Sequence, residues 1–144
     1  MSELLVLPLA AGVASAAFGV LFGVRRGNIL FAALAGWLGY LVFLAADGLG
    51  TLVAIVLASA AVALYAEVAA RLKKTPATLF LVAGLIPIVP GGSIYQGALQ
   101  AIEGHAAEAG YTLLDALMQT GAIAVGIILV SSLIKLVPRR RDEK

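Results

Sequence analysis

The sequence contains no cysteine and a single histidine, His105. Without cysteine there is no disulfide, thiolate metal site or cysteine nucleophile, and one histidine beside Glu103 and Glu108 supplies too few ligands for a metal centre. Ser93 with His105 lacks an orienting acid, which argues against a serine hydrolase, and the missing histidine and carboxylate clusters argue against a lipid-metabolising enzyme. We expect no cofactor, no metal and no enzymatic activity.

Charged residues are also scarce. They make up 12% of the 144 residues, whereas 62% are apolar, against about 25% and roughly 45–50% in soluble domains. A water-soluble fold of this size could not hide so much hydrocarbon, so lipid must surround most of the chain. The net charge is +2, but the basic residues stand between apolar runs and form no basic face with stacking aromatics. Nucleic acid is therefore not an expected partner.

The apolar runs predict an all-α membrane protein with a single transmembrane domain over residues 1–144. A helix needs roughly 20 apolar residues to cross a hydrocarbon core of about 30 Å. Ala14-Ser15-Ala16 resembles a signal-peptide cleavage site, but the residues before the first run include Glu3 and no basic residue, so we interpret the first run as a span. Five spans are expected, at about residues 4–24, 29–46, 49–70, 76–102 and 112–137.

The lysines and arginines follow the first, third and fifth runs, and the other connections hold only acidic charge. Basic residues are retained on the cytoplasmic side of a membrane. This pattern predicts an N-terminus outside and a C-terminus inside, in the inner (cytoplasmic) membrane. Arg139-Arg140-Arg141 would fix this topology and contact anionic lipid.

Two local patterns concern helix packing. Gly19-x3-Gly23 and Ala35-x3-Gly39 are small-x3-small faces, on which helices in lipid pack closely. Glu67 precedes Arg71 by four residues, the favourable order for an ion pair on one helix.

The fourth run is interrupted by prolines and glycines. Thr75 can cap a helix whose first residue is Pro76. Pro87 and Pro90 lack the donors that a continuous helix needs, and Gly91-Gly92 let the backbone turn. We therefore expect a span broken near residues 87–92. The helix should restart at Ser93, because Ser93-Ile94-Tyr95-Gln96 fits a capping box.

A helix that starts inside the membrane suggests a binding site. Its unpaired N–H groups and partial positive charge favour a carboxylate, and irregular backbone at that depth needs protein or a water-filled cavity beside it. The alternative is an amphipathic segment from Ser93 to Glu103 lying flat in the outer interface. The candidate substrate-binding residues are Pro87, Pro90, Gly91, Gly92, Ser93, Tyr95 and Gln96.

Further polar residues follow the interruption. Gln96, Gln100 and Glu103 form a stripe at helical spacing that would line a vestibule. Asp115 and Gln119 share one face of the last run, where Asp115 is either a proton-coupling carboxylate or a solvated interfacial one. Gln100, Asp115 and Gln119 are therefore candidates for coupling or for lining the cavity.

The segment from Leu85 to Tyr95, with Pro87, Pro90, Gly91 and Tyr95 in place, resembles the IPxxPGxxxY signature of the threonine/serine exporter (ThrE) family. The Gly-rich run Leu34-Ala35-Gly36-Trp37-Leu38-Gly39 is similar to that family's second helix. The likeness is greatest to the small YjjB-like subunit, which implies a separately encoded, larger YjjP-like partner. Amino-acid and dicarboxylate export are both attributed to the family.

These observations lead to two hypotheses. In the first, the chain is a subunit of a secondary exporter that moves small carboxylate-bearing metabolites, such as threonine, serine or succinate, out of the cytoplasm, as a hetero-oligomer or a homo-oligomer. In the second, the chain is a scaffold subunit, and transport happens elsewhere in a larger transporter.

Overall fold

The computed structural model describes residues 3–136, which form helices and no strands. The all-α class predicted from the apolar runs is therefore confirmed for this part of the chain. Residue 137, the expected end of the last span, lies outside the described residues, as do Arg139, Arg140 and Arg141. The elements in order are α1 (Glu3–Leu21), η1 (Arg26–Asn28), α2 (Ile29–Ala46), η2 (Asp47–Leu49), α3 (Thr51–Lys73), α4 (Ala77–Leu85), η3 (Ile86–Ile88), α5 (Gly91–Ile102) and α6 (Ala106–Leu136).

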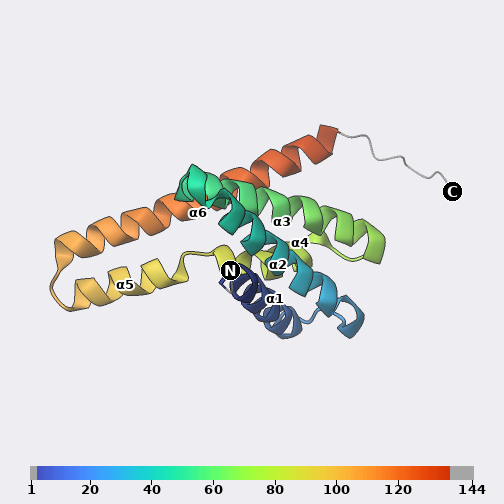
Figure 1. Cartoon of the computed structure of the whole chain (residues 1–144), viewed down its shortest axis with the longest axis horizontal. Helices are drawn as coiled ribbons and strands as arrows, with labels where there is room; N and C mark the ends of the chain where they lie inside the picture. Colours follow the sequence, from blue (N-terminus) through green and yellow to red (C-terminus); the bar gives the residue numbers. More distant parts are fainter. Residues whose placement is uncertain (1–2, 137–144) are drawn as a thin grey trace.

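The first four α-helices form a bundle to which a long hairpin is attached (Figure 1). Helix α2 packs against α1, α3 and α4, and α3 also packs against α6. Helix α5 packs mainly on α6, and α5 with the N-terminal part of α6 projects away from the bundle (Figure 1). The interrupted segment between α4 and α5 is thus the point where the chain leaves the bundle.

Several helices are long and apolar enough to cross a membrane. They are α2 with its flanking turns (Arg26–Leu49), α3 and α6. The pair Ala77–Ile88 and Gly91–Ile102 qualifies only as a unit, and its two parts are bent by 53°. The apolar part of α1, Val6–Leu21, is shorter. The chain is a multi-pass helical membrane protein, and the count of five crossings stays a prediction.

Helix boundaries depart from the apolar runs where local backbone chemistry decides them. Helix α1 ends at Leu21 because Gly23 takes a left-handed φ of +73°. The N–H of Val24 then donates to the carbonyl of Gly19 (2.9 Å), which closes a Schellman cap. Helix α6 begins at Ala106, before the expected 112, because Glu108 interrupts the apolar run but, like the alanines beside it, favours a helix.

The start of α4 also differs from the prediction. Pro76 occupies the N-cap, no side chain caps the helix, and α4 begins at Ala77. The cap predicted for Thr75 is therefore wrong. Its hydroxyl donates to the carbonyl of Lys73 (3.0 Å) and accepts from the Asn28 amide (3.1 Å) instead.

Small residues bring α2 against α3 and α4. Ala35 is fully buried, and a Cβ added to Gly84 of α4 would lie 2.7 Å from the Cβ of Ala35. A Cβ on Gly39 would lie 2.5 Å from Val62 of α3. The packing face predicted at Ala35-x3-Gly39 is confirmed. Of the face Gly19-x3-Gly23, Gly19 packs on Ala32 of α2, whereas Gly23 lies outside α1 and faces open space, so that half of the prediction is wrong.

Helices α3 and α6 approach each other closely at Gly126. A Cβ there would lie 2.5 Å from the carbonyl oxygen of Val56, 3.0 Å from the amide nitrogen of Ala60 and too close to the hydroxyl of Ser59. Ser59 is fully buried and donates to the Val56 carbonyl (3.1 Å). This contact anchors the root of the hairpin on the bundle.

The described basic residues gather at one end of the bundle. Arg25 shares a cavity with Lys73 and Lys74, and Arg71 lies beside Ile134, next to Lys135. Glu67 and Arg71 line one cavity but form no ion pair, so the predicted pair is wrong. We attribute this to the exposed position of Arg71, whose guanidinium gains little from leaving water.

Candidate functional site

The interruption between α4 and α5 consists of two tight turns, the 3-10 turn η3 and a second turn centred on Pro90. The chain tightens into η3 at Ile86–Ile88, Val89 is extended, and the Val89 N–H donates to the carbonyl of Leu85 (3.2 Å). Pro90 has φ −75° and ψ 49°, close to an inverse γ-turn. The Gly91 N–H closes this turn on the Val89 carbonyl (2.7 Å). Pro87 and Pro90 have no N–H to donate, so the helical hydrogen bonds stop here.

The helix restarts earlier than the sequence predicted. Helix α5 begins at Gly91 with Pro90 as N-cap and no side-chain cap. The capping box at Ser93 and Gln96 is therefore wrong, because Ser93 already lies inside the first turn. Gly91 and Gly92 also do not use the left-handed backbone freedom of glycine, since neither has a positive φ. The turn at Pro90 redirects the chain instead.

The first turn of α5 holds free backbone donors. The Ile94 N–H donates to the Pro90 carbonyl (3.1 Å), as the first helical hydrogen bond of α5. The N–H groups of Gly92 and Ser93 find no acceptor among residues 3–136. Unpaired N–H groups at a helix start carry partial positive charge and bind anionic oxygens.

The interruption runs from the core to the surface. Ile88 is 7% exposed and belongs to a buried cluster with Val62 of α3 and Ile123 of α6. Pro90 is buried and Pro87 half-buried, whereas Gly91 and Gly92 are exposed. A Cβ added to either glycine would meet no atom within 4 Å. The donors of the first turn are therefore open to a ligand or to another protein.

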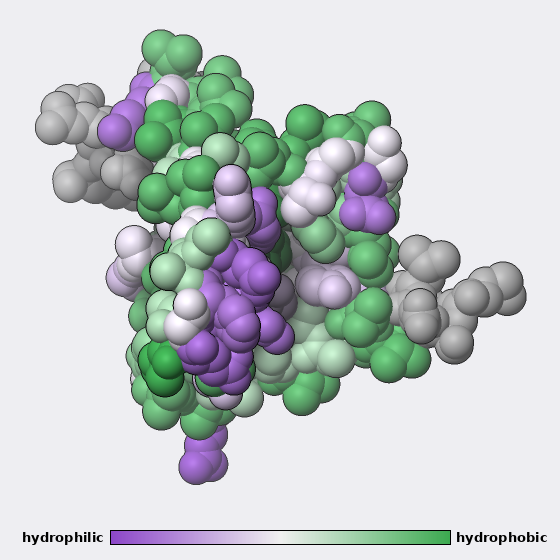
Figure 2. Space-filling view, turned by 90° about the vertical axis from the view of Figure 1, so that its left-hand side faces the viewer, coloured by the Kyte–Doolittle hydropathy of each residue, from purple (hydrophilic) through white to green (hydrophobic). Residues whose placement is uncertain are grey.

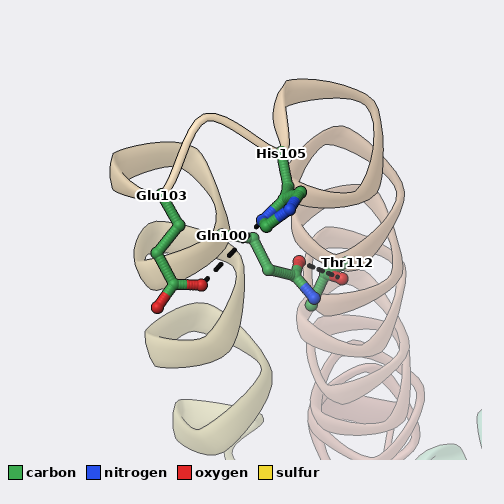
Figure 3. Close-up of polar contacts among 4 residues, drawn as sticks. All are labelled: Gln100, Glu103, His105 and Thr112. Atoms are coloured by element: carbon green, nitrogen blue, oxygen red, sulfur yellow. Dashed lines mark hydrogen bonds and ion pairs between the residues drawn. The ribbon is translucent and has the colours of Figure 1, made fainter.

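Helix α5 turns only part of its predicted polar stripe toward α6. Gln100 is half-buried, and its side-chain oxygen accepts a hydrogen bond from the Thr112 hydroxyl (2.8 Å; Figure 3). Gly97, on the same face, packs against Leu113. Ser93 is half-buried, whereas Gln96 is exposed and Tyr95 is 68% exposed. Gln100 thus joins the hairpin, and Tyr95 and Gln96 are available for contacts outside the chain.

The remaining polar candidates lie along the projecting hairpin. The Gln119 amide donates to the carboxylate of the exposed Asp115 (2.7 Å). At the turn between α5 and α6, His105 lies 3.9 Å from Glu103 (Figure 3). Figure 2 views this end of the molecule, where a hydrophilic patch stands among largely apolar surfaces. The interrupted segment therefore joins an apolar bundle to a hairpin with a polar tip.

Other cavities in the described part of the chain lie away from residues 87–96. An apolar one of about 480 Å³ lies between α1 and α2, around Gly12 and Trp37. A polar one of about 530 Å³ contains Arg25, Lys73 and Lys74. In the sequence, these cations indicate membrane topology alone. Only the contact between two distant connections reveals the polar cavity.

Comparison with known families identifies the chain. The family described as Threonine/Serine exporter, ThrE, matches residues 8–133. The chain belongs to this family. The family resemblance inferred from the Pro-Gly signature is thereby confirmed, and the exporter family is a transporter family and not an enzymatic one. No curated protein and no solved structure matches the chain.

Proposed function

We propose that this chain is a subunit of a secondary exporter that moves small carboxylate-bearing metabolites out of the cytoplasm. Threonine, serine and dicarboxylates such as succinate are the substrate candidates. Membership of the threonine/serine exporter family over residues 8–133 carries the proposal. In it, the chain crosses the inner membrane five times, with α4 and α5 as two halves of one broken span and the basic end in the cytoplasm.

The proposed substrate site is the first turn of α5. The free N–H groups of Gly92 and Ser93 would receive the carboxylate, because they are unpaired and stand at the positive end of the helix dipole. The Ser93 hydroxyl can add a third hydrogen bond. Tyr95 and Gln96, both exposed, would contact the rest of the solute. Gln100, Asp115 and Gln119 would line the path or couple transport to a proton.

A second chain is part of this proposal, because this chain leaves one side of the site open. Gly91 and Gly92 are exposed, and a Cβ added to either would meet no atom within 4 Å among the described residues. Irregular backbone within a membrane must face protein or water, so a larger YjjP-like subunit or a second copy would close the site. Access would then alternate as the two parts rock against each other.

The same exposure favours a second candidate function, in which the chain is a scaffold. The projecting hairpin has apolar side chains on its surface, such as Tyr95, Ile102 and Tyr111. A partner helix docked on them would place the substrate path wholly within the partner. In that case labelled substrate analogues would cross-link only to the partner, and removal of this chain would merely destabilise it.

Efflux from cells that carry Gly91→Leu or Gly92→Leu tests the exporter proposal. Neither position has a positive φ or an atom within 4 Å of an added Cβ, so both variants should fold and reach the membrane. Leucine would block the N–H groups from a solute, and efflux should be lost. Gly110→Leu is the matched control, since Gly110 on α6 is equally open. Normal efflux from both Gly91→Leu and Gly92→Leu, at normal membrane levels, would reject the site.

A further inference from the structure

The two connections at the basic end of the bundle enclose a pocket that the export site does not use. One connection follows α1 and contributes Arg25 and Asn28, and the other follows α3 and contributes Lys73, Lys74 and Thr75. The pocket between them has a volume of about 530 Å³. No carboxylate lines it, and no acidic side chain among residues 3–136 pairs with its cations.

The pocket is held in shape by contacts between the two connections. Asn28 is 8% exposed, and its amide donates to the Thr75 hydroxyl across 47 residues of sequence (3.1 Å). The Thr75 hydroxyl in turn donates to the carbonyl of Lys73 (3.0 Å). The ammonium of Lys73 lies 4.3 Å from the centre of the Phe31 ring, which limits its motion. These contacts hold the two connections together and place the ammonium of Lys73.

Two features of the backbone add to the positive potential. Lys74 ends α3 in a left-handed conformation (φ 50°), which separates its side chain from the helix that carries Lys73. Pro76 lines the pocket and is the N-cap of α4, whose start has no side-chain cap. The positive end of the α4 dipole thus adjoins three cations.

We propose that this basic pocket is an oxyanion site that binds a phosphate or carboxylate group. Three cations that pair with no carboxylate in the described part of the chain surround a polar space, and they can stabilise a multiply charged oxygen ligand through charge-assisted hydrogen bonds. Two sources offer this chemistry, the headgroup phosphate of an anionic phospholipid and a soluble anion. A headgroup can reach the pocket because it lies at the end of α3, which is long enough to cross a membrane. Binding at this pocket does not depend on the substrate site at α5.

Binding to the purified full-length chain, together with any subunit that co-purifies, tests the proposal in two arms. The first arm measures retention of phosphatidylglycerol over phosphatidylcholine in nanodiscs, in phosphate-free buffer. The second arm measures binding of inorganic phosphate and of succinate in lipid-free neutral detergent at constant ionic strength. Lipid retention without anion binding identifies a headgroup as the ligand, and binding of phosphate or succinate identifies a soluble ligand. Each of these two outcomes supports the site.

The test variant is Arg25→Gln combined with Lys74→Asn, because asparagine tolerates the left-handed backbone at position 74. The matched control is Arg26→Gln combined with Arg71→Gln, which removes equal charge from the same end but leaves the pocket lining intact. We expect binding to weaken at least roughly tenfold in the test variant and to stay within about twofold in the control. Equal weakening in both variants, or no binding in either arm by the natural chain, would overturn the proposal.

Discussion

The close approach of α3 and α6 makes Gly126 a position where a single methyl group should destabilise the fold. In Gly126→Ala the new Cβ would stand 2.5 Å from the carbonyl oxygen of Val56 and 3.0 Å from the amide nitrogen of Ala60. Both are backbone atoms of α3, so no side chain can move aside. The two helices would have to separate, and the hairpin root would loosen.

Gly121 on the same helix supplies the control, because a Cβ there meets no atom within 4 Å. Alanine favours a helix over glycine by roughly 1 kcal/mol at both positions. Overpacking costs about 1–3 kcal/mol, and only Gly126→Ala incurs it. Gly121→Ala should therefore be neutral or slightly more stable than the natural chain. The free energy of unfolding of Gly126→Ala should lie about 1–3 kcal/mol below that of Gly121→Ala.

The assay is reversible unfolding of each purified variant in mixed micelles with increasing SDS, followed by circular dichroism. Comparing two glycine-to-alanine changes on one helix cancels the difference in helix propensity, so the gap between them measures packing alone. If Gly126→Ala were as stable as Gly121→Ala, the close contact between α3 and α6 in this structure would be refuted.

Two further predictions concern the turns and the hairpin. Gly23→Ala should lower the free energy of unfolding by about 1 kcal/mol, because alanine is strained at the left-handed φ of 73° that Gly23 takes. In the same SDS titration, the control Gly27→Ala, at a position without a positive φ, should leave this free energy unchanged. Equal values for the two variants would contradict the Schellman cap. Thr112→Val should remove the hydrogen bond to Gln100, which contributes about 1 kcal/mol to the stability of the hairpin. Amide hydrogen–deuterium exchange in α5 should therefore become faster. Unchanged exchange would count against this contact.

The parts of the fold that depend on hydropathy could be predicted from the sequence. The expected run 29–46 coincides with α2 (Ile29–Ala46), and the run 49–70 lies close to α3 (Thr51–Lys73). Lipid selects for continuous apolar sequence, so composition alone finds such helices. Helix α6 was placed six residues late because its first turns, which contain Glu108, are polar enough to escape hydropathy yet still helical.

The details of the candidate site were harder to predict. Pro87 and Pro90 indicate that helical hydrogen bonds must stop, since neither can donate one. The serine at position 93 looks like an N-cap in the sequence, but the γ-turn at Pro90 starts α5 at Gly91. Local patterns could not decide between these two starts, because both place a helix after the same proline.

Contacts between segments distant in the chain could not be predicted from the sequence. The hydrogen bond from Asn28 to Thr75 joins two connections 47 residues apart. In the sequence, Arg25 and Lys73 indicate only topology. The hydrogen bond between Asn28 and Thr75 brings their two segments together, so that both residues line one pocket. The same holds for Gly126, whose role depends on which helix lies opposite.

The central claim is that the first turn of α5 faces a water-accessible cavity that a carboxylate solute occupies. The chain has no cysteine, so Gly92→Cys introduces a unique thiol that reports this position alone. The rate at which a membrane-impermeant thiol reagent labels it, in cells that contain the complete exporter, is the direct measurement. Gly110→Cys on the hairpin is the control. We predict that Gly92→Cys is labelled and that threonine, serine or succinate slows its labelling but not that of the control. A Gly92→Cys protein that stays unlabelled, or whose labelling none of these solutes changes, would contradict the account.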